Sequence, residues 1–220
     1  MIKNELLKRI LTSLLLLPIL VFSILYGKFY FGCILFIVFF IASYEWYFIN
    51  KKSYTALFSG FFIILASIFS AYFLNGDSFE SKILFLWILS ISFFSDIGGY
   101  TFGKMIGGKK LTKISPNKTI SGMYGSFIFS IFPIIVIYIL EQLGLTDLEK
   151  IIFSIKTIIL SLVFSLICQL GDITVSHFKR KNNIKDTGNI LPGHGGLLDG
   201  IDGLIFLLIF SAILKIFKFI

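Results

Sequence analysis

The sequence predicts an all-α integral membrane protein, a polytopic bundle of transmembrane helices, and three observations carry that prediction. Hydrophobic residues make up 56% of the chain and charged residues only 15%. The mean hydropathy of +0.93 lies far above that of a soluble domain. The apolar residues also fall into continuous runs of roughly 20 residues, which is the length at which an α-helix crosses a bilayer.

About seven apolar runs are long enough to span the membrane, and they cover residues 10–26, 29–49, 55–74, 82–102, 122–140, 151–171 and 203–220. The first two are the least clearly divided, because only Tyr26-Gly27-Lys28 separates them. Basic residues precede the first run, as in a signal peptide. Its apolar stretch is long for that role, however, and no small-x-small cleavage site precedes Lys28, so we expect a retained helix.

The charge distribution predicts the orientation of these helices. The net charge is +8, and most lysines and arginines lie at the N-terminus, after the second run, and in the segments 103–121 and 172–202. The positive-inside rule then places the N-terminus and both glycine-rich segments in the cytoplasm, and the C-terminus outside. Lys215 and Lys218 do not fit this orientation. Because membrane orientation accounts for the basic residues, we expect no nucleic acid partner.

No linker, low-complexity tract or fixed-period repeat divides the chain, so residues 1–220 are interpreted as a single membrane domain. Cys33 and Cys168 both lie inside apolar runs, where we interpret them as small packing residues and expect no disulfide. Glu45 stands beside two aromatic residues near the inner end of the second run. We interpret it as an interfacial anchor.

A first polar cluster closes the fourth run and continues into the segment after it. Asp96 lies within apolar sequence, where a carboxylate is costly, so it should face a cavity, a cation or a metal rather than lipid. The glycines allow close backbone approach, and nearby lysines and hydroxyls can hold phosphate oxygens. By themselves these residues fit either a phosphate-binding loop or a basic loop attracted to anionic lipid. The candidate substrate-binding side chains after Asp96 are Ser115, Lys118 and Thr119.

A second polar cluster lies between the last two runs. Asp172, Asp199 and Asp202 are candidate metal ligands, because hard carboxylate oxygens suit Mg²⁺. The cations of this segment could then hold a polyphosphate, and they are Lys179, Arg180 and Lys185. The alternative for Asp172 is a helix-end charge that pairs with one of these cations.

His194 lies among glycines and has no apolar face to pack into. It is a candidate hydrogen-bond donor or proton carrier at a reacting phosphate, since an imidazole exchanges protons near neutral pH. The alternative is a solvated loop histidine. Gly195 and Gly196 would let backbone N–H groups reach an anion, and the start of the following helix favours negative charge. Asp186 is assigned to the substrate-binding set and interpreted as a residue that orients Lys185 or Arg180, in preference to a metal ligand.

This second cluster resembles the signature of the phosphatidate cytidylyltransferases, also called CDP-diglyceride synthases. The matching residues are Ser176, Lys179-Arg180, Lys185-Asp186, Gly188, Pro192, His194-Gly195-Gly196, Asp199 and Asp202. One position departs, because Gly200 stands where the family usually has arginine. Residues 115–122 are similar to the family's Ser-Pro-Lys-Lys-Thr-x-Glu-Gly element, with Asn117 and Ser121 differing, and this favours phosphate binding by the first cluster.

The resemblance implies an enzyme that joins CTP and phosphatidic acid into CDP-diacylglycerol and pyrophosphate. It implies Mg²⁺ as cofactor, with K⁺ as a further monovalent cation, and a bacterial inner membrane with the active site facing the cytoplasm. The implied metal ligands are Asp172, Asp199 and Asp202, and the implied phosphate-holding residues are Lys118, Lys179, Arg180 and Lys185. A homodimer is one assembly that this reading leaves open.

Two other functions also stay open on the sequence alone. One is a related polyprenol- or phytol-type lipid kinase, which would differ in its nucleotide substrate. The other is an ion-coupled transporter that uses Asp96 and Asp172 as an ion path. An ATPase P-loop and a Gly-x-Ser-x-Gly nucleophile motif are both absent from the sequence.

Overall fold

A computed structural model describes the chain apart from residues 1, 113–114, 116, 143–153 and 191–194. The described part is helical, as predicted. In chain order the helices are α1 (Ile2–Tyr26), α2 (Lys28–Asn50), α3 (Tyr54–Leu74), α4 (Phe79–Met105), α5 (Ile120–Ser130), α6 (Phe132–Gln142), α7 (Ile155–Lys181) and α8 (Leu197–Ile216).

Within the described residues, six helical segments are long and apolar enough to cross a membrane: α2, α3, α4, Ile120–Ile139 at α5 and α6, α7 and α8. The prediction of a helical membrane protein is therefore confirmed. In α1 the apolar stretch Leu14–Tyr26 is shorter than these six. The predicted seventh span at 10–26 consequently stays a prediction.

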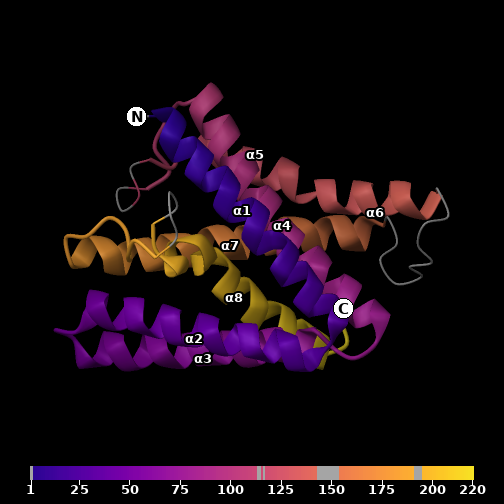
Figure 1. Cartoon of the computed structure of the whole chain (residues 1–220). Helices are drawn as coiled ribbons and strands as arrows, with labels where there is room; N and C mark the ends of the chain where they lie inside the picture. The colour runs from indigo at the N-terminus through magenta and orange to yellow at the C-terminus, as the bar shows by residue number, and fades with distance from the viewer. Residues whose placement is uncertain (1, 113–114, 116, 143–153, 191–194) are drawn as a thin grey trace.

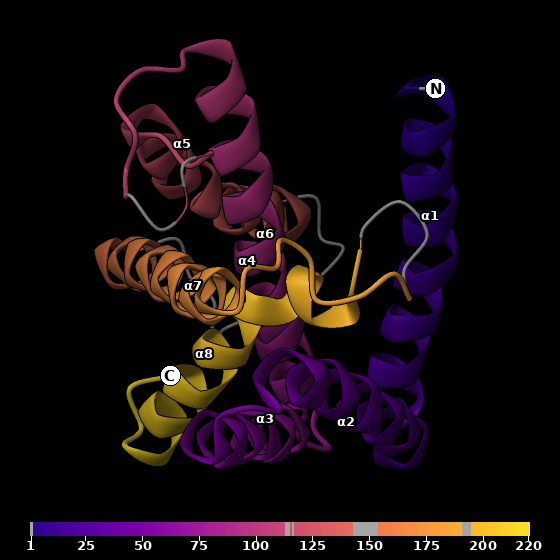
Figure 2. The ribbon, with the colours of Figure 1, turned by 90° about the vertical axis from the view of Figure 1, so that its left-hand side faces the viewer.

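Successive helices alternate in direction along the bundle, except that α6 continues in the direction of α5 (Figure 1). The α2–α3, α4–α5 and α7–α8 connections gather at one end, together with the N-terminus. The α1–α2 and α3–α4 connections lie at the other end with the C-terminus. Figure 2 looks onto the first of these ends, where α8 begins between α7 and α2. Both polar clusters of the sequence therefore lie at the same end of the molecule.

The structure corrects the extent of the second cluster's loop. Residues 172–181 continue α7 as helix, and residues 197–202 already belong to α8. Three basic residues occupy the last turn of α7, where a cation is favourable near the helix C-terminus. Asp172 and Lys179 are thus held on one helix, and Asp199 and Asp202 on another, instead of all four lying in the connecting segment.

Glycines let α4 and α5 pack in direct backbone contact. A Cβ at Gly125 would lie 2.5 Å from the carbonyl oxygen of Gly98, and one at Gly122 would lie 2.7 Å from that of Gly99. Small residues commonly permit such approach between membrane helices. Gly98 and Gly99, which the sequence predicted to allow close backbone approach to a phosphate, serve helix packing instead. Positive φ occurs later, at Gly107 and Gly108.

A second close crossing joins α7 to α8. A Cβ at Gly203 would lie 2.7 Å from the carbonyl oxygen of Cys168, and one at Gly171 would lie 3.1 Å from that of Asp202. Cys168 is buried in the core, as expected, whereas Cys33 is exposed, and both thiols are free. Since Gly171 precedes Asp172 and Gly203 follows Asp202, the crossing brings two of the predicted carboxylates together.

Candidate active site

Lys179, in the last turns of α7, is the buried cation of the site. Its Nζ lies 2.8 Å from Oδ1 of Asp199 and 3.7 Å from Oδ2 of Asp202, and the three side chains are only 9–11% exposed. The two carboxylates stand three residues apart on α8 and so share one face of that helix. Burying charges is costly unless they are paired, so one ammonium group here neutralises part of two carboxylates.

Asp199 closes the first turn of α8. Its Oδ2 accepts hydrogen bonds from the N–H of Thr187 at 2.7 Å and the N–H of Gly196 at 3.0 Å, and it lies 3.1 Å from the Thr187 hydroxyl. Gly196 is the N-cap of α8 and Asp199 is its third helical residue, which is the acidic half of a capping box. Both oxygens of Asp199 are therefore engaged by donors of the protein.

Asp172 meets a different lysine. It forms an ion pair with Lys118, from the segment before α5, and accepts a hydrogen bond from the Ser176 hydroxyl at 3.2 Å. Asp96, on α4, interacts electrostatically with both Asp172 and Lys118. Asp202 interacts with the same groups from α8. Carboxylates from α4, α7 and α8 and two lysines therefore converge at one end of the bundle.

The predicted metal set of Asp172, Asp199 and Asp202 is not gathered around one point. Among the described residues, no three histidine, cysteine, aspartate or glutamate side chains form a group that could hold an ion. The reason is the engagement of Asp199 with the start of α8. Asp172 and Asp202 remain neighbours across the glycine crossing. They still fit Mg²⁺, because that ion commonly uses one or two protein carboxylates and completes its shell with phosphate and water.

The residues predicted before α5 have mixed roles. Lys118 belongs to the site through Asp172, and its carbonyl oxygen accepts from the N–H of Leu111 at 2.8 Å. Thr119 is the N-cap of α5, and its hydroxyl accepts from the N–H of Gly122 at 3.1 Å. Ser115 donates its N–H to the Thr112 hydroxyl. Thr119 and Ser115 are thus engaged in building the segment that carries Lys118.

The predicted charged site residues at the end of α7 and just after it are more exposed than Lys179. Arg180 is exposed and donates to the carbonyl oxygen of Ile184 at 2.9 Å, while Lys185 and Asp186 are exposed. The Gly196 N–H, expected to approach an anion, is taken by Asp199. Gly195 has a φ of 94°, in the left-handed region that favours glycine. His194 lies outside the described residues, so its proton-transfer role stays a prediction.

Glu45 is the residue of this site that the sequence interpretation missed. The interfacial-anchor interpretation is wrong, because the side chain is 2% exposed. Its carboxylate accepts from the N–H groups of Leu197 at 2.9 Å and Leu198 at 2.8 Å, and from the Thr187 hydroxyl at 2.7 Å. The sequence did carry a signal for Glu45, namely a carboxylate within an apolar run. A carboxylate in such a place is costly unless it has a partner, and this argument, applied to Asp96, applies equally to Glu45.

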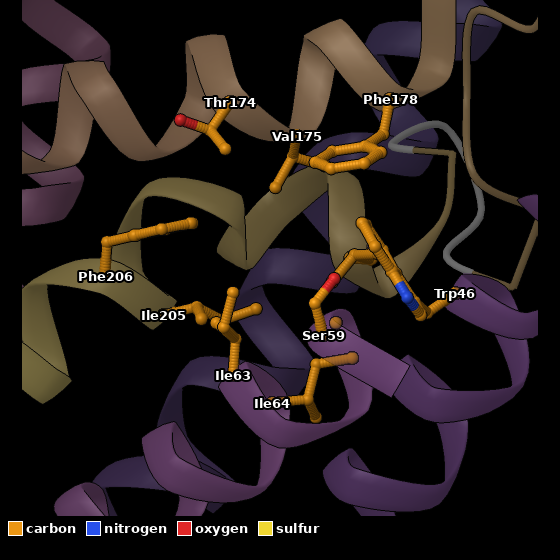
Figure 3. A pocket seen from close by; sticks show the side chains of 11 residues that line it. Trp46, Ser59, Ile63, Ile64, Thr174, Val175, Phe178, Ile205 and Phe206 are labelled. Atoms are coloured by element: carbon orange, nitrogen blue, oxygen red, sulfur yellow. The ribbon is translucent and has the colours of Figure 1, made fainter. Parts of the chain in front are cut away.

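An apolar cavity of about 50 Å³ adjoins the polar site between α2, α3, α7 and α8 (Figure 3). The indole of Trp46 closes one side of it and donates to the carbonyl oxygen of Ala56 at 3.0 Å. Phe178 and Leu198, which also line the cavity, directly precede Lys179 and Asp199 in sequence. The polar site therefore borders an apolar wall.

Comparison with known proteins gives matches over most of the chain. A sequence profile of the cytidylyltransferase family matches residues 50–217. A phosphatidate cytidylyltransferase of Rickettsia bellii is 36% identical over 208 residues, which cover 92% of this chain and 87% of the relative. One from Rickettsia conorii is 33% identical over 220 residues, covering 98% and 93%. One from Staphylococcus aureus is 42% identical over 128 residues, covering 56% and 45%.

The buried ion pair leads to a stability prediction. Lys179→Met leaves Asp199 and Asp202 without their cation, and removing one partner of a buried pair costs about 3 kcal/mol or more. We expect a clearly lower Tm of the purified protein in detergent, and partial recovery when Asp199→Asn is added. Lys185→Met, at an exposed lysine, is the matched control and should leave Tm nearly unchanged. A Lys179→Met protein as stable as the wild type would contradict the pairing.

Proposed function

The chain belongs to the cytidylyltransferase family, and we propose that it is a phosphatidate cytidylyltransferase that joins CTP to phosphatidic acid. The observation that carries the proposal is the convergence of Asp172 and Asp202 with Lys118 and Lys179 at one end of a membrane bundle. Full-length relatives disfavour the two alternatives, a lipid kinase and an ion-coupled transporter.

The reaction joins two anions. A phosphate oxygen of phosphatidic acid attacks the α-phosphorus of CTP, the bond from that phosphorus to the β-phosphate bridge breaks, and pyrophosphate leaves with the bonding electrons. Repulsion between the two substrates opposes their approach, so fixed cations are needed to offset it. Lys118 and Lys179 supply charge inside the site, and the exposed Arg180 and Lys185 can meet the distal phosphates from outside.

Asp172 and Asp202 would hold Mg²⁺, with Asp96 near enough to strengthen the field. When bound, the ion would neutralise phosphate charge and polarise the α-phosphoryl group. The ion pair between Asp172 and Lys118 would break, so that Asp172 could bind the metal ion and Lys118 a phosphate oxygen. K⁺ and a homodimer stay predictions, without residues assigned to them.

The lipid substrate would approach sideways from the bilayer, because its headgroup must reach the polar site while its chains stay in an apolar medium. The apolar cavity beside Phe178 and Leu198 supports this approach (Figure 3). CTP would enter from the aqueous side at the same end. The basic residues there favour the cytoplasmic side of a bacterial inner membrane, where nucleotides are available.

A turnover assay tests the activity. Purified protein with radiolabelled CTP, phosphatidic acid and Mg²⁺ should form CDP-diacylglycerol, and omission of phosphatidic acid or Mg²⁺ should abolish it. Asp172→Asn should lower kcat roughly 10²-fold, the usual scale for losing one electrostatic contact to the transition state. Asp77→Asn, at an exposed carboxylate of the opposite end, is the control. Retention of more than about a tenth of the activity by Asp172→Asn would contradict the assignment.

Gly200 offers a gain-of-function test. It is exposed in the first turn of α8, nothing lies within 4 Å of a Cβ built there, and its φ is not positive. Restoring the family's arginine with Gly200→Arg should therefore preserve the fold and lower KM for CTP roughly fivefold, as one added charge-assisted hydrogen bond would. Gly200→Gln, whose side chain is long but neutral, should not lower KM for CTP. A folded but inactive Gly200→Arg protein would contradict the proposed place of CTP.

The orientation has its own test. In a Cys33→Ser background, Asn189→Cys should resist an impermeant thiol reagent in intact cells and react in inverted vesicles, because it would face the cytoplasm. Asp77→Cys, at the opposite end of the bundle, should show the reverse pattern. Both positions are exposed, and the remaining Cys168 is buried. Labelling of Asn189→Cys in intact cells would refute the proposed side.

A further inference from the structure

We propose that Glu45 is a positioning residue of the reaction: it holds the first turn of α8 and, through Thr187, sets the place of Asp199 and Lys179. The inference rests on the proposed function for its effect on turnover. Glu45 lies on α2, outside residues 50–217 that the family profile matches. Its three hydrogen bonds nevertheless all go to residues of the signature segment or directly beside it.

The bonds form a continuous chain from α2 to the buried cation. The Thr187 hydroxyl lies 2.7 Å from Glu45 and 3.1 Å from Asp199, and its single proton can satisfy only one of them fully. The shorter contact, to Glu45, leaves Asp199 to the N–H groups of Thr187 and Gly196. The other oxygen of Asp199, Oδ1, accepts from Lys179 at 2.8 Å.

Two glycines of the signature make room for this carboxylate. A Cβ at Gly196 would lie 2.6 Å from Oε2 of Glu45 and 1.9 Å from the Thr187 hydroxyl oxygen. A Cβ at Gly188 would lie 3.0 Å from Oε1 of Glu45. The sequence predicted that Gly196 lets an anion approach the start of α8. In the described geometry Gly196, together with Gly188, makes room for a protein carboxylate.

Electrostatics explains why the carboxylate sits there. Glu45 lies in α2, five residues before the end of that helix. The N-terminus of α8 is positive and has N–H groups without helical acceptors. Glu45 accepts from two of them, so it fixes both the position and the direction of the turn that carries Asp199 and leads to Asp202. Misplacing reacting groups by about 1 Å can lower a rate roughly 10²-fold.

The test compares Glu45→Gln with the pair Thr187→Val and Thr187→Ser, with exposed Glu80→Gln as the control. A glutamine keeps the reach of Glu45, but its amide nitrogen cannot accept, so one N–H of α8 loses its acceptor. We measure kcat and KM for CTP well below each variant's Tm, together with deuterium exchange of the Thr187, Leu197 and Leu198 amides. We expect Glu45→Gln to lower kcat roughly tenfold to 10²-fold with little change in KM, and to speed exchange at Leu197 and Leu198.

Thr187→Val should lower kcat in the same way, Thr187→Ser should retain most of it, and the Glu45→Gln/Thr187→Val double variant should lose less than the product of the single losses. If Glu45→Gln does not fold, the two Thr187 variants decide the question. A Glu45→Gln protein with a lower Tm but wild-type kcat would show a structural role only and overturn the inference. A wild-type protein without turnover would overturn the proposed function. The role of Glu45 is judged apart from turnover by amide exchange, and unchanged exchange at Leu197 and Leu198 in Glu45→Gln would overturn that role.

Discussion

The first turn of α8 presents backbone N–H groups that have no acceptor within their own helix, and a buried N–H group left unsatisfied costs about 1–3 kcal/mol. The chain supplies two carboxylates for them. Asp199 accepts from Gly196, and Glu45 accepts from Leu197 and Leu198. The remaining oxygen of Asp199 holds Lys179, which also faces Asp202. The positions of the charged groups in the site therefore depend on how the first turn of α8 is capped.

This capping divides the acids of the site into two groups. Glu45 and Asp199 are committed to backbone N–H groups and to a buried lysine, so they hold structure in place. Asp172, Asp202 and Asp96 are bonded mainly to lysines or lie in their field. Such ion pairs can exchange partners when phosphate and a divalent cation arrive, because the lysine and the carboxylate then each find an opposite charge. In sequence the two groups are indistinguishable.

Helix crossings at glycine bring the second group together. Gly171 and Gly203 let α7 and α8 touch beside Asp172 and Asp202, and the glycines of α4 and α5 set the distance between Asp96 and the segment carrying Lys118. Without a hydrophobic force between helices in lipid, close backbone packing is a main source of association. The same contacts that stabilise the bundle therefore position the groups that must meet two anionic substrates.

The sequence by itself determined the helical membrane fold, the family and the polar segments, because apolar run length and the spacing of the signature are local properties of the chain. It also predicted Lys179, Asp172 and Asp202 as site residues, and the structure places these three side chains near one another. Only the tertiary structure decided which donor each acid meets. Asp199 became the partner of Lys179 and Glu45 a buried partner of α8, because those bonds join α2, α7 and α8 across distances in sequence that no local pattern records.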